Sequence, residues 1–280
     1  MDEGAAARAN GPSAQVVFYR PAPALRDAIE SYFIFDVFGP VRDIVPPGWA
    51  HLGWILEGEW RAGRPGGEMA DVPRAALGGP RERAMVAQGT ASRVIGATLT
   101  PLGWTQIVRR RAAEFDGRTV PMRAVFGAAC EGLAPRLRAA PDLQALDLLD
   151  DFFARRRTTT LADWRVARAH ALLCDERVLT VEDWAARLGV GERQLERLCG
   201  RYFGLSPKRL LRRERLIRTL NQVRAAPPAA WSSAIGEAYA DQPHFVREFR
   251  WFMHLTPGAW LRRERHLDRR AGRREVGSVQ

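Results

Sequence analysis

Cysteine is scarce in this sequence, with only Cys130, Cys174 and Cys199 among 280 residues. The three are far apart, form no CxxC pair and are odd in number, which argues against a disulfide framework and against a cysteine-based zinc site. We therefore expect no bound metal and no cofactor. Lysine is scarcer still, because Lys208 is the only one and arginine carries the remaining basic charge.

Long hydrophobic runs are also missing. No apolar stretch approaches the roughly 20 residues that a membrane-spanning helix needs. Residues 1–15 are small and polar and include Asp2 and Glu3, unlike a secretory signal. We expect a cytoplasmic protein without a membrane partner.

Motifs for catalysis are lacking as well. The glycine-rich stretches 63–67 and 78–79 have neither the strand-then-helix setting nor the Lys-Ser/Thr pattern of a phosphate-binding loop. His51 has no second His or Cys at a metal-ligand spacing. We therefore name no catalytic residue and expect that the protein is not an enzyme.

The positive charge is concentrated in one part of the chain. The net charge is +11, and residues 155–270 hold 24 of the 43 basic and 13 of the 32 acidic residues, so this stretch carries the whole excess. The rest is neutral in sum. A localised basic excess favours a polyanionic partner for the C-terminal part.

Residues 15–100 alternate short apolar stretches with Gly and Pro breaks such as Pro46-Pro47-Gly48 and Gly78-Gly79-Pro80. That spacing predicts a small β-barrel or sandwich. The predicted strands contain residues 16–19, 32–38, 52–56 and 94–99, and the predicted helices cover residues 24–30, 101–113, a segment opened by Pro121, and 142–153.

A polar stretch, Arg155 to Thr160, has no apolar periodicity and suggests an inter-domain linker. The predicted organisation is α+β: an N-terminal sensor or dimerisation domain over 15–154, a linker over 155–162, an all-α domain over 163–268, and a disordered basic tail over 269–280. Two domains suit this length.

The all-α part repeats itself at an offset of 50 residues. The segment 205–215, LSPKRLLRRER, aligns with 255–265, LTPGAWLRRER, and Leu195, Arg197 and Tyr202 align with Phe245, Arg247 and Phe252. Such self-similarity indicates a duplicated unit.

Each unit predicts helix, tight turn, helix. In the first, Thr180 is a good N-cap, Gly189 ends the helix, and a second helix runs to about Phe203 before Gly204. In the second, Trp231, Ala234 and Ile235 belong to the first helix, Tyr239-Ala240 to the turn, and Asp241 caps a helix from Gln242 to about Met253. A long helix over 206–224 joins the units.

The second helix of each unit has one buried face and one face rich in long hydrogen-bond donors. Arg and Gln side chains bind guanine and adenine edges in the major groove, whereas other basic side chains contact phosphates. The expected base-contacting residues are Arg193, Gln194, Arg197, Gln242, His244 and Arg247. The expected phosphate-contacting residues are Arg201, Lys208, Arg209 and Arg250. Glu196 and Glu248 more naturally stabilise neighbouring arginines.

At these residues the sequence resembles the AraC/XylS family of bacterial transcription regulators. Residues 188–198, LGVGERQLERL, resemble the first helix-turn-helix of that family, and residues 239–249, YADQPHFVREF, followed by Leu255-Thr256-Pro257, resemble its signature region. The resemblance covers roughly 166–267 and implies a DNA-binding domain of seven helices. Ala238 stands where the family usually has Gly.

The N-terminal part resembles the small cupin-like sensor domains of some AraC-type regulators. The resemblance implies binding of a small-molecule effector, formation of a homodimer, or both, and RNA polymerase as a partner if the protein activates transcription. Trp49, Trp54 and Trp60 are candidates for lining an effector pocket, although tryptophan in a β-domain is more often part of the core.

Two hypotheses of function follow. The first is a transcription regulator that reads two adjacent major-groove half-sites of double-stranded promoter DNA and responds to an effector. The second is a less specific DNA-binding or interaction protein whose N-terminal domain only oligomerises. A DNA-repair methyltransferase fused to such a domain is a third class, but the activated Cys, nearby His and metal-ligand cysteines that it requires are absent.

Overall fold

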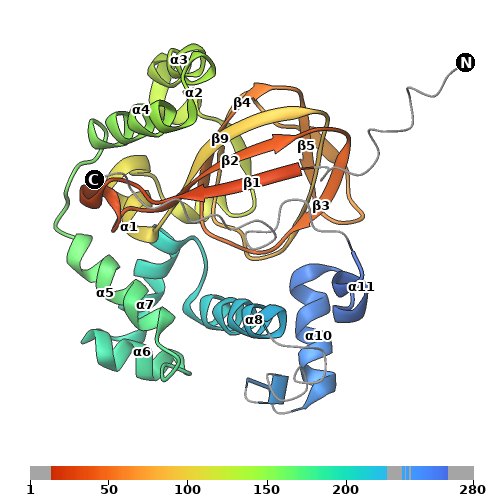
Figure 1. Ribbon diagram of the computed structural model, residues 1–280. Coiled ribbons are helices and arrows are strands. Elements are labelled where there is room, and N and C mark those ends of the chain that lie inside the picture. The colour runs from red at the N-terminus through yellow and green to blue at the C-terminus, as the bar shows by residue number, and fades with distance from the viewer. Residues whose placement is uncertain (1–13, 226–234, 237, 240, 264–280) are drawn as a thin grey trace, which may run out of the picture.

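The computed structural model describes residues 14–225, 235–236, 238–239 and 241–263 (Figure 1). The N-terminal part contains two antiparallel sheets, one of six strands in the order β1-β2-β9-β4-β7-β10 and one of four in the order β3-β8-β5-β6. The strands are β1 (Ala14–Tyr19), β2 (Ile29–Val37), β3 (Val41–Val45), β4 (His51–Glu57), β5 (Trp60–Gly63), β6 (Met69–Asp71), β7 (Ala75–Gly78), β8 (Met85–Gly89), β9 (Ser92–Leu99) and β10 (Thr119–Pro121). The predicted small β-domain and its four strands are confirmed.

The six-stranded sheet is buried on both faces. Along β2, Phe33 and Val37 face a cluster shared with the four-stranded sheet, whereas Tyr32 and Ile34 face a second cluster on the opposite side. This alternation is the period of two expected of a strand. Because both faces are covered, the central strands are apolar almost throughout, as the sequence of β4 shows.

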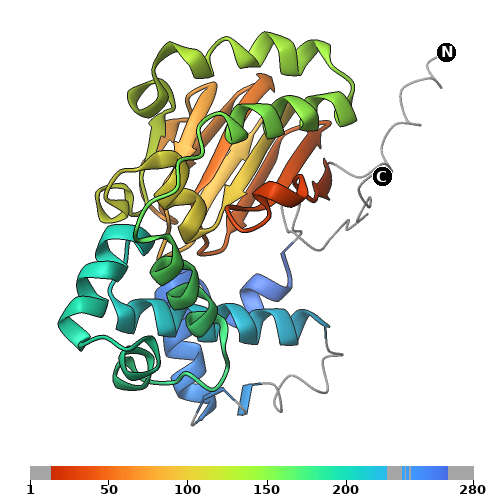
Figure 2. The same ribbon diagram turned by 90° about the vertical axis from the view of Figure 1, so that its left-hand side faces the viewer.

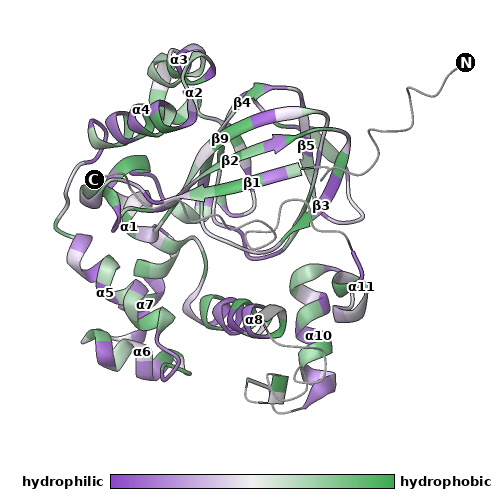
Figure 3. Cartoon of the chain, viewed as in Figure 1, coloured by the Kyte–Doolittle hydropathy of each residue, from purple (hydrophilic) through white to green (hydrophobic). Residues whose placement is uncertain are grey.

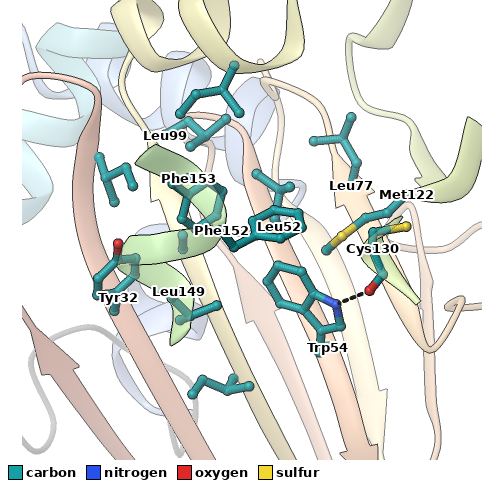
Figure 4. Close-up of a cluster of buried hydrophobic side chains, with 14 of the residues drawn as sticks. Tyr32, Leu52, Trp54, Leu77, Leu99, Met122, Cys130, Leu149, Phe152 and Phe153 are labelled. Carbon is teal, nitrogen blue, oxygen red and sulfur yellow. Dashed lines mark hydrogen bonds between the residues drawn. The ribbon is translucent and has the colours of Figure 1, made fainter. Parts of the chain in front are cut away.

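Helices cover the face of the six-stranded sheet that bears the second cluster (Figure 2). These helical segments are α2 (Arg123–Phe126), η4 (Gly127–Cys130), α3 (Leu133–Ala139) and α4 (Asp142–Ala154). Leu149, Phe152 and Phe153 of α4 pack on the sheet beside Trp54 of β4 (Figure 4). The helix predicted over residues 142–153 is therefore confirmed.

Two other helix predictions for this part are wrong in extent. Residues 24–30 form only the 3-10 turn η1 (Pro23–Leu25), because the apolar run that starts at Ile29 pairs with β1 and β9 as β2. The helix from Pro101 ends at Val108, comprising α1 (Pro101–Gly103) and the π-helical η2 (Trp104–Val108). The Trp104 indole then donates to the carbonyl of Arg110, and a short 3-10 turn, η3 (Ala112–Phe115), follows.

Pro121 does not open a helix. It ends β10, which pairs with β7 at the edge of the six-stranded sheet. An edge strand tolerates proline because one side of the strand needs no ladder hydrogen bond. The helix α2 starts two residues later, at Arg123.

The C-terminal part is helical and lies against the sandwich (Figure 1). Residues 155–162 connect α4 to its first helix. The helical segments are α5 (Asp163–Cys174), α6 (Val181–Leu188), α7 (Glu192–Leu198), the π-helical η5 (Cys199–Phe203), α8 (Pro207–Ala225), α10 (Gln242–Met253) and α11 (Pro257–Leu261). The predicted tail over 269–280, Trp231, Ala234 and Ala240 lie outside the described residues.

Candidate DNA-binding surface

Capping residues define the helix ends in the first helix-turn-helix unit. Thr180 Oγ1 accepts a hydrogen bond from the Asp183 amide at 3.1 Å and caps α6. Gly189 ends α6 with φ of 72°, in the left-handed region that favours glycine. After the turn, the Gly191 amide donates to Gln194 Oε1 at 3.3 Å, which closes the start of α7. The two predicted ends of α6 are confirmed.

The second helix of this unit has the predicted two faces. Leu195, Leu198, Cys199 and Phe203 are buried. The side chains on the outer face are exposed, and they are Arg193, Gln194, Arg197 and Arg201. The side chains of Arg193 and Arg197 have no hydrogen bond or ion pair with any described residue. The helix thus presents free guanidinium groups to solvent.

In the second unit, Asp241 caps α10 by accepting from the His244 amide at 2.5 Å. Phe245, Phe249 and Phe252 are buried. The exposed residues of this helix include Gln242, Arg247 and Arg250. This face corresponds to the outer face of α7, as the sequence repeat predicts.

His244 differs from its neighbours because it is only partly exposed. Its ring meets Tyr239 edge to face at 5.4 Å, and Nε2 lies 3.6 Å from Glu248 Oε2. The structure therefore places this predicted base-contacting residue beside the interior of the unit. Sequence spacing puts His244 on the outer turn of the helix but does not show the aromatic neighbour from the preceding turn.

Glu248 holds the second unit to α8. Its carboxylate is buried and receives Arg215 Nη2 at 2.9 and 3.0 Å and Arg212 Nε at 3.3 Å. Tyr239 OH donates to the same carboxylate at 3.4 Å, and burial followed by the Glu248 charge raises the pKa of this phenol. A buried carboxylate needs such partners to offset its lost hydration. The contacts fix α10 relative to the connecting helix.

The turn before α10 accommodates Ala238 without strain. Ala238 and Tyr239 both donate their amides to the Ile235 carbonyl, at 3.1 and 2.9 Å. Among the described non-glycine residues, positive φ occurs only at Arg109 and His254. Alanine therefore suits this position, and glycine's conformational freedom is not required here.

The connecting helix α8 carries alternating hydrophilic and hydrophobic residues (Figure 3). Leu210 packs with the first unit, and Leu216 and Leu220 pack with the second. Lys208 and Arg209 lie in the first turn of α8, and both residues are exposed. The helix predicted over 206–224 is confirmed, and it spans the distance between the two units.

Arg209 is not free. Its Nε and Nη2 both bond the carboxylate of Glu82, a buried residue between β7 and β8. This bidentate pair joins the first turn of α8 to the sandwich. A predicted phosphate-contacting residue is therefore neutralised by a carboxylate of the N-terminal part.

A second set of contacts surrounds Trp49 in the loop before β4. The Arg213 guanidinium of α8 lies 3.8 Å from the centroid of the Trp49 ring and is 1% exposed. His170 of α5 and Phe203 contact the same ring edge to face at 5.3 and 5.9 Å. Trp49 is thus covered by the helical part.

The second unit also touches the sandwich. The Ala84 amide donates to the Phe252 carbonyl at 2.8 Å, and the Arg83 guanidinium lies 4.0 Å from the Trp251 ring. Ile44 and Val86 share a hydrophobic cluster with residues of α8 and α10. The sandwich therefore contacts both units and the helix between them.

The three candidate pocket tryptophans are not brought together. Trp54 is fully buried under α4 and donates its indole N–H to the Cys130 carbonyl at 3.1 Å. Trp60 lies between the two sheets and donates to Ser92 Oγ at 3.0 Å. The three tryptophans belong to three different hydrophobic clusters, so they do not line one cavity.

The described residues were also searched for a metal site and for a membrane-spanning helix. No group of three or more His, Cys, Asp or Glu side chains there has the arrangement to hold a metal ion. No described helix is both long enough and apolar enough to cross a membrane.

A β-sandwich joined to two helix-turn-helix units, each with a basic outer face, defines a protein of the helix-turn-helix class. Residues 184–263 match a family model described as "Helix-turn-helix domain". This match lies within the C-terminal region and agrees with the resemblance noted there in the sequence. No curated protein matches the chain.

Several solved structures are similar at low identity. A variant of apo ToxT from Vibrio cholerae is 11% identical, with 90% of this chain and 98% of ToxT covered and a TM-score of 0.46. ToxT bound to an unsaturated fatty acid is 11% identical, with 91% and 96% covered and a TM-score of 0.46. The AraC-like transcriptional activator CuxR is 13% identical, with 80% and 92% covered and a TM-score of 0.31. At these TM-scores the family model, and not these structures, assigns the domain.

Proposed function

We propose that the protein is a sequence-specific, DNA-binding transcription regulator that reads two adjacent major-groove half-sites through α7 and α10. The observation that carries this proposal is the pair of exposed, donor-rich helix faces held on one connecting helix. Two recognition helices about one helical turn apart, ~34 Å, can enter successive major grooves on one face of DNA.

The side chains divide by expected role. In this proposal, the base-contacting residues are Arg193, Gln194 and Arg197 of α7 and Gln242, His244 and Arg247 of α10. Arg201, Lys208 and Arg250 are exposed and suit phosphate contacts, which position the protein without reading sequence. Arg209 can join the phosphate-contacting residues when its ion pair with Glu82 is broken.

The N-terminal part acts, in this proposal, as a sensor or dimerisation domain. The Glu82–Arg209 ion pair and the Arg213–Trp49 contact connect the sandwich directly to α8. A small-molecule effector regulates DNA binding only if it favours one arrangement of the two parts by differential affinity. The interface supplies the contacts that differ between a docked and a released arrangement.

The test is binding of the purified full chain to its own upstream DNA and to scrambled DNA of the same length, across a salt series. The regulator function predicts a footprint over two half-sites and a specificity ratio of at least roughly 10³. Equal affinity for both DNAs, with a steep salt dependence, supports instead a less specific DNA-binding protein whose N-terminal domain only oligomerises. Absence of binding to either DNA at low salt contradicts DNA binding by the ligand-free protein.

A further inference from the structure

Three basic side chains lie where the sandwich meets the C-terminal end of α10. Arg83 lies in the segment between β7 and β8, Arg64 directly follows β5, and His254 ends α10. All three residues are exposed. Burial lowers the pKa of His254, and the positive charges of Arg83 and Arg64 lower it further. The two arginines, called the junction arginines below, are therefore close to the end of α10.

Contacts with α10 hold Arg83 in place. Its guanidinium lies over the Trp251 ring, 4.0 Å from the ring centroid. The amide of the next residue, Ala84, donates to the Phe252 carbonyl at 2.8 Å. A guanidinium that lies over an aromatic ring contacts it through its flat face, and its N–H donors at the edge stay available for a phosphate. The structure thus positions Arg83 without using its hydrogen-bond donors.

Nearby carboxylates do not neutralise the junction arginines. The side chains of Arg64 and Arg83 have no hydrogen bond or ion pair with any described residue. Glu82, next to Arg83 in the chain, is buried and bound to Arg209. Glu68 follows Arg64 by four residues and is exposed, but no ion pair joins the two. Positive charge without a partner at the surface attracts a polyanion.

Other arginines of the two sheets differ in this respect. Arg61 Nε lies 3.2 Å from Asp71 Oδ1 on the neighbouring strand. Arg93 binds two carboxylates, those of Asp36 at 2.7 Å and of Asp142. The charges of Arg61 and Arg93 are therefore offset within the N-terminal part, unlike those of the junction arginines.

The junction arginines continue the basic outer face of α10. Arg247 is exposed and lies one turn before Trp251, which carries Arg83. Arg250 is also exposed, lies one turn before His254 and accepts its amide at 2.9 Å. Residues one turn apart share a face of a helix. The basic face of α10 therefore extends past the end of the helix onto the sandwich.

The length of α10 indicates what this extension can contact. Its 12 residues give a helix about 18 Å long. The major groove is only ~12 Å wide. If the N-terminal half of α10 reads bases inside the groove, the C-terminal end reaches the phosphates that border it. The junction arginines lie at that end.

We propose that Arg64 and Arg83 of the sandwich bind DNA phosphates at the border of the half-site read by α10, so that the N-terminal part forms part of the DNA-binding surface. This inference rests on the proposed function, because it requires DNA on α10. Phosphate contacts add affinity without reading sequence. Breaking the ion pair of Glu82 does not remove these contacts, because the residues that follow it remain bound to α10.

The test is fluorescence anisotropy of the full chain with upstream DNA and with scrambled DNA of the same length, across a salt series. Arg64→Gln is the first variant, because the Arg64 side chain has no hydrogen bond or ion pair with any described residue and its removal leaves the interface intact. We expect roughly fivefold weaker binding to both DNAs and a salt slope reduced by about 1.

Arg74→Gln is the matched control. Arg74 is exposed and precedes β7, at the opposite end of that strand from the segment that carries Arg83. Its replacement removes the same charge from the same domain, and we expect the affinity and the salt slope to stay unchanged.

Two variants of Arg83 separate its charge from its contact with Trp251. Lysine keeps the charge but loses the planar group, so Arg83→Lys is expected to keep the natural salt slope, whereas Arg83→Gln lowers it by about 1. Thermal unfolding shows whether both variants are folded. Equal reductions of the slope in the two variants would show that Arg83 acts only through packing on α10, and would overturn its phosphate contact.

The remaining outcomes distinguish this inference from the proposed function. DNA binding by the natural chain with unchanged slopes in Arg64→Gln and Arg83→Gln would overturn the inference alone. An equal loss of slope in Arg74→Gln would reflect only the net charge of the domain and would also overturn it. Absence of DNA binding by the natural chain would contradict the proposed function, and the inference with it.

Discussion

Glu82 of the sandwich and Arg209 of α8 form a bidentate ion pair in which the carboxylate is buried and the guanidinium is half exposed. The pair joins the N-terminal part to the first turn of the helix that carries both helix-turn-helix units. An arginine held this way is neutralised and cannot pair with a DNA phosphate at the same time. If Arg209 contacts a DNA phosphate, as the proposed function expects, the ion pair and DNA binding compete.

Glu82→Gln is expected to raise DNA affinity, because it weakens the hold on Arg209. A charge-assisted bond contributes about 1.5–3 kcal/mol, and partial loss of it corresponds to a gain of roughly fivefold in affinity. Fluorescence anisotropy with upstream DNA measures the change, and Glu59→Gln serves as a control at an exposed glutamate of the same domain. Reduced affinity in Glu82→Gln would show that the docked arrangement itself binds DNA.

Arg197 and Arg201 distinguish base reading from phosphate contact on one helix. Arg197→Ala is expected to cost about 1–3 kcal/mol on upstream DNA and to change binding to scrambled DNA little. Arg201→Ala is expected to weaken binding to both DNAs equally and to reduce the salt slope by about 1. Equal losses of Arg197→Ala on the two DNAs would argue against direct base reading by that residue.

Gly204 is expected to tolerate no side chain. Its φ is +87°, and a Cβ at this position would lie 2.5 Å from Pro80 Cγ and 3.2 Å from the Ala112 carbonyl oxygen. Gly204→Ala should lower the free energy of unfolding by about 1–3 kcal/mol, since it adds left-handed strain to a contact between the two parts of the chain. Gly200→Ala is the matched control, because nothing lies within 4 Å of its Cβ position. Equal thermal unfolding midpoints for the two variants would contradict this account.

His170 is expected to make the protein less stable in acid. Burial lowers its pKa, with smaller and opposing effects from Glu214, which raises it, Arg213, which lowers it, and Glu30, which raises it. The unfolded chain therefore binds the proton more readily, so this contribution to stability is complete above pH ~6.5 and is lost as the pH falls below that value. Urea unfolding between pH 7.5 and 5 measures the slope.

A shallower slope between pH 7.5 and 5 is expected for His170→Gln, which does not titrate. Trp49 and Phe203 flank the imidazole, so this variant also tests whether the loss in acid arises at the contact between the two parts. An unchanged slope would assign the pH dependence to other groups.

Local signals in the sequence predicted the parts of the structure that are decided by near neighbours in the chain. Helix α6 begins at the N-cap Thr180 and ends at Gly189, and α10 begins at the N-cap Asp241, all as expected. A cap acts within three or four residues, so its effect can be predicted from the sequence. The 50-residue repeat revealed two similar units, and the spacing of apolar residues assigned the buried face of each second helix.

Wrong predictions arose where distant residues decide the outcome. Residues 24–30 and Pro121 were expected in helices, but strand pairing with partners far along the chain places Ile29 and Glu30 in β2 and Pro121 in β10. Trp49, Trp54 and Trp60 are close in sequence and enter three separate clusters, because they lie in a loop, in β4 of the six-stranded sheet and in β5 of the four-stranded sheet.

The sequence by itself determined the β-domain, the basic C-terminal part and the duplicated helix-turn-helix units, since periodicity, capping and charge are local properties. Only the tertiary structure decided that Glu82 holds Arg209, that the His244 ring meets Tyr239, and that the Arg213 guanidinium covers the Trp49 ring. Each of those relationships joins side chains through packing of separate elements. Burial and charge pairing across that packing have no counterpart in the spacing of residues along the chain.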